Sequence, residues 1–225
     1  MVTARGGSRR LPGKNLRVLG GKPLIVWSID VAKDVPEICD MLVSTDDIRI
    51  AQVARSAGAL VPWMRPAELA SDTASSVDVA LHALEWYERE HGVVDGLLLL
   101  QPTSPFRTKD TVREGLRLFT IHEQRPVVAV SPTPAHPMWT FKIEDDCLQP
   151  FMAREHFQTR SQDLPPAFVV NGSLYLVRPQ DLRADRSFVG PPTTPLIIPS
   201  PSEALDIDVE WDWFIAETIL ASRAS

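Results

Sequence analysis

The chain has 225 residues, of which 44% are hydrophobic and 23% charged, and its formal net charge at pH 7 is −6. This length suffices for an α/β core, so we expect a single domain over residues 1–225. The acidic balance argues against a nucleic-acid-binding protein, because such proteins carry a basic surface. No stretch approaches the ~20 apolar residues of a membrane span and no apolar leader precedes the first motif, so we expect a cytoplasmic protein without a membrane partner. Cys39 and Cys147 lack the spacing of a disulfide framework or zinc site, and we expect both to be packed thiols.

A loop rich in glycine and arginine follows a very short apolar run at the start of the chain. Residues 2–16 read VTARGGSRRLPGKNL, and their basic side chains are Arg5, Arg9, Arg10 and Lys14. Gly6 and Gly7 let the backbone approach a ligand, so that amide N–H groups can point at phosphate oxygens. The loop therefore predicts a triphosphate site, although it has neither the Walker A nor the dinucleotide-binding pattern. The alternative is a flexible basic tail.

Helical and strand-like segments alternate over most of the remaining chain. Apolar spacing predicts helices over residues 24–32, 48–57, 77–90 and 111–122, and buried strands over 41–45, 96–100 and 126–131. This alternation indicates an α/β protein with a doubly wound, mostly parallel sheet. Polar residues follow two of the strands, Asp46 after the first and Gln101, Thr103 and Ser104 after the second. Ligands of open α/β sheets bind at this edge. Residues 61–70 look irregular, and the hydroxyls of 71–76 are suited to cap the next helix.

Prolines and aromatic side chains interrupt the alternation over about residues 132–168. We expect a protruding excursion, a hairpin arm, that packs on a second subunit, because exposed aromatic side chains are costly in a monomer. Strand-like residues 168–177 follow, with Asn171 and Gly172 forming a bulge or turn. Residues 191–201 look like a proline-rich connection, and 210–221 like a last helix.

Asp206 and Asp208 lie on the same face of an extended segment, because side chains there repeat every two residues. Two carboxylates beside a triphosphate loop provide the hard oxygen ligands that Mg²⁺ (or Mn²⁺) prefers. The alternative is an acidic turn that caps the last helix, a role that suits Glu210 and Asp212.

Motifs in order from Ala4 to Trp213 closely resemble those of the acylneuraminate cytidylyltransferases, the CMP-sialic acid synthetase family. The motifs are ARGGSRRLPGKN (4–15) with GGKPL (20–24), RPAELASD (65–72), LQPTSPFR (100–107), NGSLY (171–175) and DIDVEW (206–211). The resemblance implies a Rossmann-like fold of the nucleotide-diphospho-sugar transferase type with a dimerisation arm. It also implies transfer of CMP from CTP to the anomeric hydroxyl of a 2-keto nonulosonic acid, with release of pyrophosphate.

The resemblance further implies roles for individual residues. Candidates for nucleotide binding are Arg5, Gly6, Gly7, Ser8, Arg9, Lys14, Asn15 and Arg65, with Ser75 or Ser76 at the base. Candidates for acceptor binding are Gln101, Thr103, Ser104, Arg160, Asn171 and Tyr175. Asp206 and Asp208 are the expected metal ligands and, with Arg5 and Lys14, the expected catalytic residues. One departure concerns Arg160, because the family often has arginine at the position of Ser161, so its contact with the acceptor carboxylate stays open.

Three other functions fit parts of the pattern. A cytidylyltransferase for 3-deoxy-octulosonate or a phosphonate would keep the CTP motifs and change the acceptor pocket. A glycosyltransferase also uses a pair of aspartates but releases no pyrophosphate. A non-catalytic nucleotide-binding protein would bind CTP without turnover. No histidine is placed as an obvious general base, so we prefer metal-assisted deprotonation of the acceptor hydroxyl.

Overall fold

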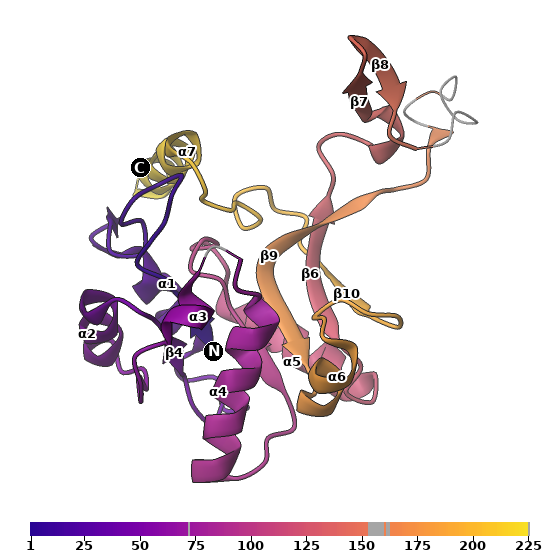
Figure 1. Cartoon of the computed structure of the whole chain (residues 1–225). Helices are drawn as coiled ribbons and strands as arrows, with labels where there is room; N and C mark the ends of the chain where they lie inside the picture. The colour runs from indigo at the N-terminus through magenta and orange to yellow at the C-terminus, as the bar shows by residue number, and fades with distance from the viewer. Residues whose placement is uncertain (72, 153–159, 161–162, 225) are drawn as a thin grey trace.

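The structure is a computed structural model, and it describes residues 1–71, 73–152, 160 and 163–224 (Figure 1). At its centre is a sheet with the strand order β4-β1-β5-β9-β6-β10. Its strands are β1 (Val2–Thr3), β4 (Val43–Ser44), β5 (Leu97–Leu99), β6 (Val127–Pro132), β9 (Phe168–Val177) and β10 (Thr194–Ile197). Met1 connects β1 to β5, because its amino group donates to Leu98 O (2.6 Å) and its carbonyl accepts from Leu100 N (3.0 Å).

The predicted parallel arrangement is confirmed for most of the sheet. β1 pairs in parallel with β4, and β6 with β10, whereas β9 is antiparallel to both β5 and β6. The exception has a topological reason. β9 follows β6 through the excursion, which starts and finishes at the same end of the sheet, with Pro132 opposite Phe168, so β9 runs back in the opposite direction.

Helices cover both faces of the sheet. They are α1 (Leu24–Ala32), α2 (Ile48–Ser56), α3 (Ala67–Ala70), α4 (Ser76–His91), α5 (Lys109–Ile121), α6 (Pro179–Asp185) and α7 (Glu210–Ala224). Leu98 and Leu100 pack into one buried cluster with α1, α2 and α5, whereas Leu97 and Leu99 pack into another with α4 and α6. Alternate residues of β5, with Leu100 just after it, thus face opposite helical layers, which confirms the doubly wound α/β fold.

The helix boundaries follow signals in the sequence. Asp47, Ser75 and Thr108 cap α2, α4 and α5, each accepting a hydrogen bond from a backbone N–H of the first turn. Gly58, just after α2, has φ +91°, a conformation that glycine adopts without steric cost. The first four predicted helices end within two residues of the observed boundaries.

Two stretches that looked irregular contain regular structure. Residues 61–70 include the short helix α3, and residues 191–201, predicted as a plain connection, contain β10. The latter prediction was wrong because β10 lies at the edge of the sheet, next to β6 alone. Pro195 lacks a backbone N–H, but an edge strand has no second neighbour to which that N–H would have to donate. The expectation of packed thiols was also wrong, since Cys39 and Cys147 are free and exposed. A short hairpin, β2 (Val18–Leu19) with β3 (Lys22–Pro23), precedes α1.

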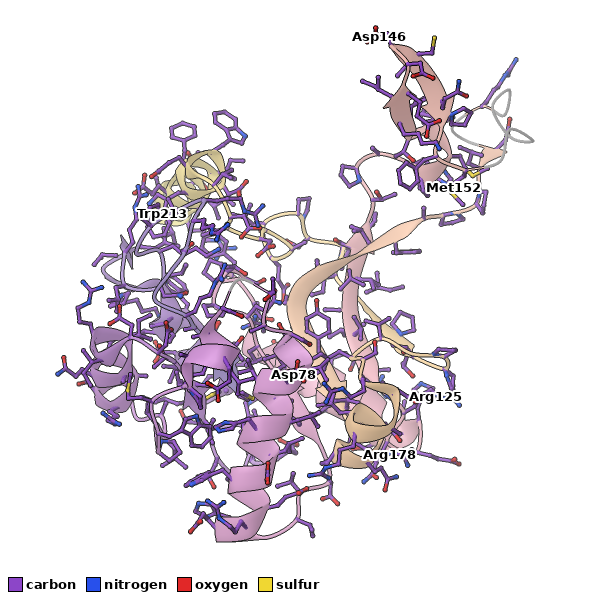
Figure 2. All side chains as sticks on the ribbon, viewed as in Figure 1. Asp78, Arg125, Asp146, Met152, Arg178 and Trp213 are labelled. Carbon is purple, nitrogen blue, oxygen red and sulfur yellow. The ribbon has the colours of Figure 1, made fainter. Side chains whose placement is uncertain are left out.

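Residues 132–152 leave the sheet and form a hairpin of β7 (Phe141–Glu144) and β8 (Cys147–Pro150), preceded by the 3₁₀ turn η1 (Pro137–Trp139). The hairpin projects well away from the body of the molecule (Figure 1), with Asp146 at its tip (Figure 2). Several of its large apolar side chains are exposed, among them Ile143 (75%), Leu148 (66%) and Phe151 (70%). Residues 153–159, 161 and 162 of the expected excursion lie outside the described residues. In the part of the chain that the structure describes, no helix has the length and apolar character needed to span a bilayer.

We predict that Leu174→Ala lowers the free energy of unfolding by about 2–5 kcal/mol, because it leaves a cavity in the core. Leu174 is 0% exposed in β9, and it lies so close to Gly115 of α5 that a Cβ there would come within 3.0 Å of it. Urea denaturation measures the change. The control Val93→Ala, at a side chain that is 91% exposed, should change it by less than about 0.5 kcal/mol. Equal effects of the two variants would contradict the assignment of Leu174 to the core.

Candidate active site

A cavity of about 610 Å³ lies at the end of the sheet where β1 and β5 finish. Its lining residues are Thr3, Arg5, Ser8, Arg9, Arg10, Lys14, Asn15, Gln101, Pro102, Thr103, Asp206 and Asp208. They come from the end of β1, the basic loop, the turn after β5 and the segment before α7. The structure therefore brings together side chains from the first and last parts of the chain, and half of the predicted site residues are among them.

The basic loop is held in place by specific contacts. Asn15, which is 6% exposed, donates from Nδ2 to Arg5 O (3.0 Å). Gly6 N donates to Asp46 Oδ1 (2.8 Å), so this amide, expected to point at phosphate, is bonded to a side chain after β4. Leu11 is 1% exposed and packs in a cluster with Ile207 and with Trp213 of α7. These contacts exclude the alternative of a flexible basic tail.

Lys14 connects the loop to the acidic segment. Its Nζ donates to Ile207 O (2.9 Å) and to Asp208 Oδ1 (2.8 Å), and Arg10 Nη2 donates to Asp208 Oδ2 (2.5 Å). Burial works against ionisation of Asp208, but the hydrogen bonds and charges of Lys14 and Arg10 outweigh it. The pKa of Asp208 therefore lies below its ordinary value.

Asp206 has the opposite shift. Burial raises its pKa first, and the charges of Asp208 and Asp212 add to that effect, while a hydrogen bond from Thr103 and the charge of Lys14 oppose it. The two carboxylates line the same cavity, and Ile207 between them is fully buried, with its N–H donating to Thr103 O (2.8 Å). This alternation is what an extended segment dictates.

The acidic residues around α7 divide into two roles. Asp212 Oδ2 accepts from Asp208 N (2.8 Å) and Val209 N (2.9 Å), so the capping alternative applies to Asp212. Asp206 and Asp208 remain directed into the cavity, as two hard oxygen donors that repel each other. This donor set suits a divalent cation. The described residues contain no group of three or more His, Cys, Asp and Glu that could hold a metal by themselves, so further ligands would be substrate oxygens or water.

A bulge of β9 lies beside the turn after β5. The β6–β9 register shifts between Val128 and Val130, and Gly172 in the bulge has φ +78°. A Cβ at Gly172 would collide with Gln101 Oε1, so the Gln101 side chain packs directly on the bulge. The predicted bulge at Asn171 and Gly172 is therefore confirmed.

Two further predicted acceptor residues lie on β9. Asn171 Oδ1 accepts from Ser173 N (3.1 Å) and Ser173 Oγ (3.0 Å), whereas its buried Nδ2 has no partner among the described atoms. Burial, and secondarily the charge of Asp206, raises the pKa of Tyr175.

Other predicted residues do not line the cavity: Gly6, Gly7, Arg65, Ser75, Ser76, Ser104, Arg160, Asn171 and Tyr175. Arg65 is 8% exposed and donates to the side chain and carbonyl of Ser44, and burial lowers its pKa. Ser75 accepts from Val77 N (3.0 Å) as a helix cap. Arg160 is exposed, and Ser161, which marks the departure from the family pattern, lies outside the described residues.

The sequence did not single out Thr3 or the contact between Asp46 and Gly6. Thr3 ends β1 and Asp46 follows β4, at the edge of the sheet where ligands of α/β proteins bind. This position is the signal that could have identified them. A larger cavity, of about 780 Å³, lies at the opposite end of the strands, between Asp40–Leu42 and Gly96–Leu98. None of the predicted site residues lines it, so we do not assign it to this site.

Known proteins with similar sequences are named as cytidylyltransferases or as synthases of a CMP-linked sugar acid. A family model described as Cytidylyltransferase matches residues 1–112. The CMP-N,N'-diacetyllegionaminic acid synthase of Legionella pneumophila is 36% identical over 222 residues, which are 98% of this chain and 94% of that protein. The pseudaminic acid cytidylyltransferase of Campylobacter jejuni is 30% identical over 175 residues, 78% of this chain and 75% of that protein. The N-acylneuraminate cytidylyltransferase of Streptococcus agalactiae is 31% identical over 84% of this chain and 45% of its own length.

Solved structures agree on the fold. A CMP:2-keto-3-deoxy-manno-octonic acid synthetase complexed with CTP has a TM-score of 0.72 at 18% identity, over 99% of this chain and 97% of that one. A 4-diphosphocytidyl-2C-methyl-D-erythritol synthase from Anaerococcus prevotii has a TM-score of 0.63 at 10% identity, over 98% and 96%. At such identities the likeness establishes the fold alone. The sequence identity to the Legionella protein over nearly the whole of both chains carries the assignment further: this chain is a nucleotidyltransferase of the acylneuraminate cytidylyltransferase family.

Proposed function

We propose that the protein transfers CMP from CTP to the anomeric hydroxyl of a nonulosonic acid and releases pyrophosphate. One observation carries the proposal. A single cavity of about 610 Å³ is lined by the basic loop, by the carboxylate pair Asp206 and Asp208, and by Gln101 of the turn after β5. These groups suit a triphosphate, a divalent cation and a polar acceptor that meet at one phosphorus atom.

The basic loop would bind the triphosphate. Attack on the α-phosphorus moves negative charge onto the departing pyrophosphate, and fixed positive groups stabilise that charge. Arg5, Ser8, Arg9 and Lys14 line the cavity on this side, while Asn15 holds the loop through Arg5 O. Arg65 would contact the cytosine with Ser75 or Ser76. Its hydrogen bonds to Ser44 hold it beside the end of β4, and the charges of Asp46 and Arg5 act on it there.

Asp206 and Asp208 would hold Mg²⁺ (or Mn²⁺), which would neutralise phosphate charge and acidify the attacking hydroxyl. The residues of the chain prepare this position. Lys14 and Arg10 keep Asp208 ionised, and Thr103 orients the carboxylate of Asp206. Lys14, which contacts Asp208 and lines the cavity, would share its charge between the carboxylate and the triphosphate.

Gln101, Thr103 and Ser104, with Asn171 and Tyr175 of β9, would bind the acceptor. Asn171 Nδ2 is a buried donor that has no partner among the described residues, and such a group favours a ligand that offers an acceptor oxygen, for example a carboxylate or an N-acyl carbonyl. The identity of 36% to the Legionella enzyme makes N,N'-diacetyllegionaminic acid the first acceptor to test. Arg160 is exposed and is a further candidate for the acceptor carboxylate.

We also propose that the protein is a homodimer that works in the cytoplasm. The hairpin of β7 and β8 exposes apolar side chains far from the body, and a second subunit would bury them (Figure 1).

Loss of the Lys14 ammonium should weaken CTP binding. Lys14→Ala removes a charge-assisted donor of the cavity, worth about 1.5–3 kcal/mol, so the Kd for CTP should rise roughly 10- to 100-fold by calorimetry. Lys109→Ala is the matched control, because Lys109 pairs with the exposed Asp34 away from the cavity. Unchanged affinity in a folded Lys14→Ala protein would contradict the triphosphate role of the loop.

Turnover should require CTP and one acid together. Pyrophosphate release is measured with Mg²⁺, with each nucleoside triphosphate, and with N,N'-diacetyllegionaminate, pseudaminate, N-acetylneuraminate, 3-deoxy-octulosonate or a phosphonate. We expect release with CTP and a nonulosonate. CTP binding without release in any mixture would instead support the non-catalytic alternative, and release only with 3-deoxy-octulosonate or the phosphonate would support the other cytidylyltransferases.

Asp208→Asn should lower kcat/KM about 100-fold or more, because it removes the charge that would hold the cation. Glu210→Gln is the control, since Glu210 lies two residues further on and pairs with Arg17 instead. Activity of Asp208→Asn at the level of this control would remove the carboxylate pair from the mechanism.

Light scattering should give a mass of twice the 25.0 kDa of one chain. The double variant Ile143→Glu and Leu148→Glu places charges on the exposed apolar hairpin and should yield the single-chain mass, because buried unpaired charges oppose association. A dimer that persists unchanged in this variant would exclude the hairpin as the interface.

A further inference from the structure

Arg107 is a buried arginine behind the turn after β5. It is 4% exposed, and it is not among the residues that line the active-site cavity. Its guanidinium donates from Nε to Ser173 O, from Nη1 to Ser28 Oγ (3.2 Å) and from Nη2 to Gln101 O (3.0 Å). The three acceptors belong to β9, to α1 and to the turn after β5, so one side chain joins three elements that are distant in sequence.

The guanidinium is placed there at an energetic cost. Among the described residues, the carboxylate whose charge acts on Arg107 is that of Glu203, and this carboxylate is itself bonded to Thr108 N (3.3 Å) and Thr111. Burial lowers the pKa of Arg107 to about 9. A buried charge without an opposite charge destabilises a fold unless hydrogen bonds to it compensate. The three acceptors, all neutral, therefore define what this residue does.

Two of these acceptors belong to segments that carry acceptor-binding candidates. Gln101 O, which Arg107 binds, also accepts from Ser28 Oγ (3.0 Å), so the backbone of the turn is fixed from two directions. Ser173 is in the bulge of β9, where its N–H and hydroxyl hold Asn171 Oδ1. The side chain of Gln101 in turn packs on Gly172 of that bulge.

We infer that Arg107 is a positioning residue for the sugar-acid acceptor: by holding Gln101 O and Ser173 O it fixes the Gln101 amide relative to Asn171. The inference rests on the proposed function, in which these two amides bind the acid. The nucleotide side is held by other contacts, namely Asn15 to Arg5, Gly6 to Asp46 and Lys14 to Asp208. Arg107 thus acts on acceptor binding and leaves CTP binding intact.

The first test compares Arg107→Met, which keeps a long side chain without donors, with Arg107→Lys, which keeps the charge. We expect Arg107→Met to raise the KM for N,N'-diacetyllegionaminate about 10- to 100-fold, because small displacements of substrate-positioning groups have effects of this size. Arg107→Lys should fall between Arg107→Met and the unaltered protein. The Kd for CTP by calorimetry should stay within about twofold in both. An equal loss of CTP affinity would show a general structural defect and overturn the inference.

Leu182→Ala is the control for destabilisation, because Leu182 is fully buried in the cluster beneath α4 and α6, away from the cavity. It should lower the Tm without raising the acceptor KM. If it raises that KM as Arg107→Met does, the effect belongs to stability and the inference fails. Ser28→Ala is the substitute should Arg107→Met not fold, since it removes one bond to Gln101 O and should raise the acceptor KM a few-fold.

A double-mutant cycle separates this inference from the proposed function. If Arg107 acts through Gln101, adding Arg107→Met to Gln101→Ala should raise the acceptor KM less than Arg107→Met does alone. An undiminished increase in the double variant would overturn the positioning role. If instead Gln101→Ala by itself leaves the acceptor KM unchanged, the acceptor role of Gln101 fails, and the positioning inference fails with it, while CTP binding by the basic loop stands.

Discussion

The contact of Lys14 with the segment before α7 holds the active site together. Lys14 Nζ reaches Asp208, 194 residues further along the chain, and the Lys14 side chain is only 12% exposed. An ion pair partly withdrawn from water is stronger than one at the surface. Leu11 and Ile207 pack beside it in one apolar cluster with Trp213 of α7. The end of the chain therefore adds a second set of contacts to those that Asn15 and Asp46 already make with the basic loop.

The two carboxylates beside this contact have opposite pKa shifts. Asp208 has Lys14 and Arg10 as partners, and its pKa is lowered, whereas burial and two neighbouring carboxylates raise the pKa of Asp206. Asp206 is thus the group whose ionised form gains most from an added positive charge in the cavity. Lys14 and Arg10 also line the space that a triphosphate would fill, so their charge would be shared between a carboxylate of the chain and the phosphates of a ligand.

The sequence was informative where local chemistry decides the structure and less so where distant segments meet. The helix caps at Ser75 and Thr108, the bulge at Gly172 and the alternation of Asp206 and Asp208 all follow from short patterns. The edge strand β10 was missed because proline tolerance depends on which neighbours a strand has. Partners such as Asp46 for Gly6, or Ser173 for Arg107, are set by the packing of the sheet, and no spacing in the sequence encodes them.

The two halves of the cavity are built in different ways. On the proposed nucleotide side, charged side chains of the loop lie in the cavity, where Arg10 and Lys14 are held by Asp208 from the end of the chain. On the proposed acceptor side, Arg107 is buried behind the backbone and holds carbonyl groups, so the groups offered to the sugar acid would be the neutral amides of Gln101 and Asn171. Charged groups attract any polyphosphate strongly. Neutral amides fixed in position bind best to a ligand with one particular arrangement of hydroxyl, carboxylate and N-acyl groups. Selection among sugar acids should therefore reside in the geometry of the β9 bulge and the turn at Gln101, and changes in that backbone should alter the preferred acid without altering the nucleotide.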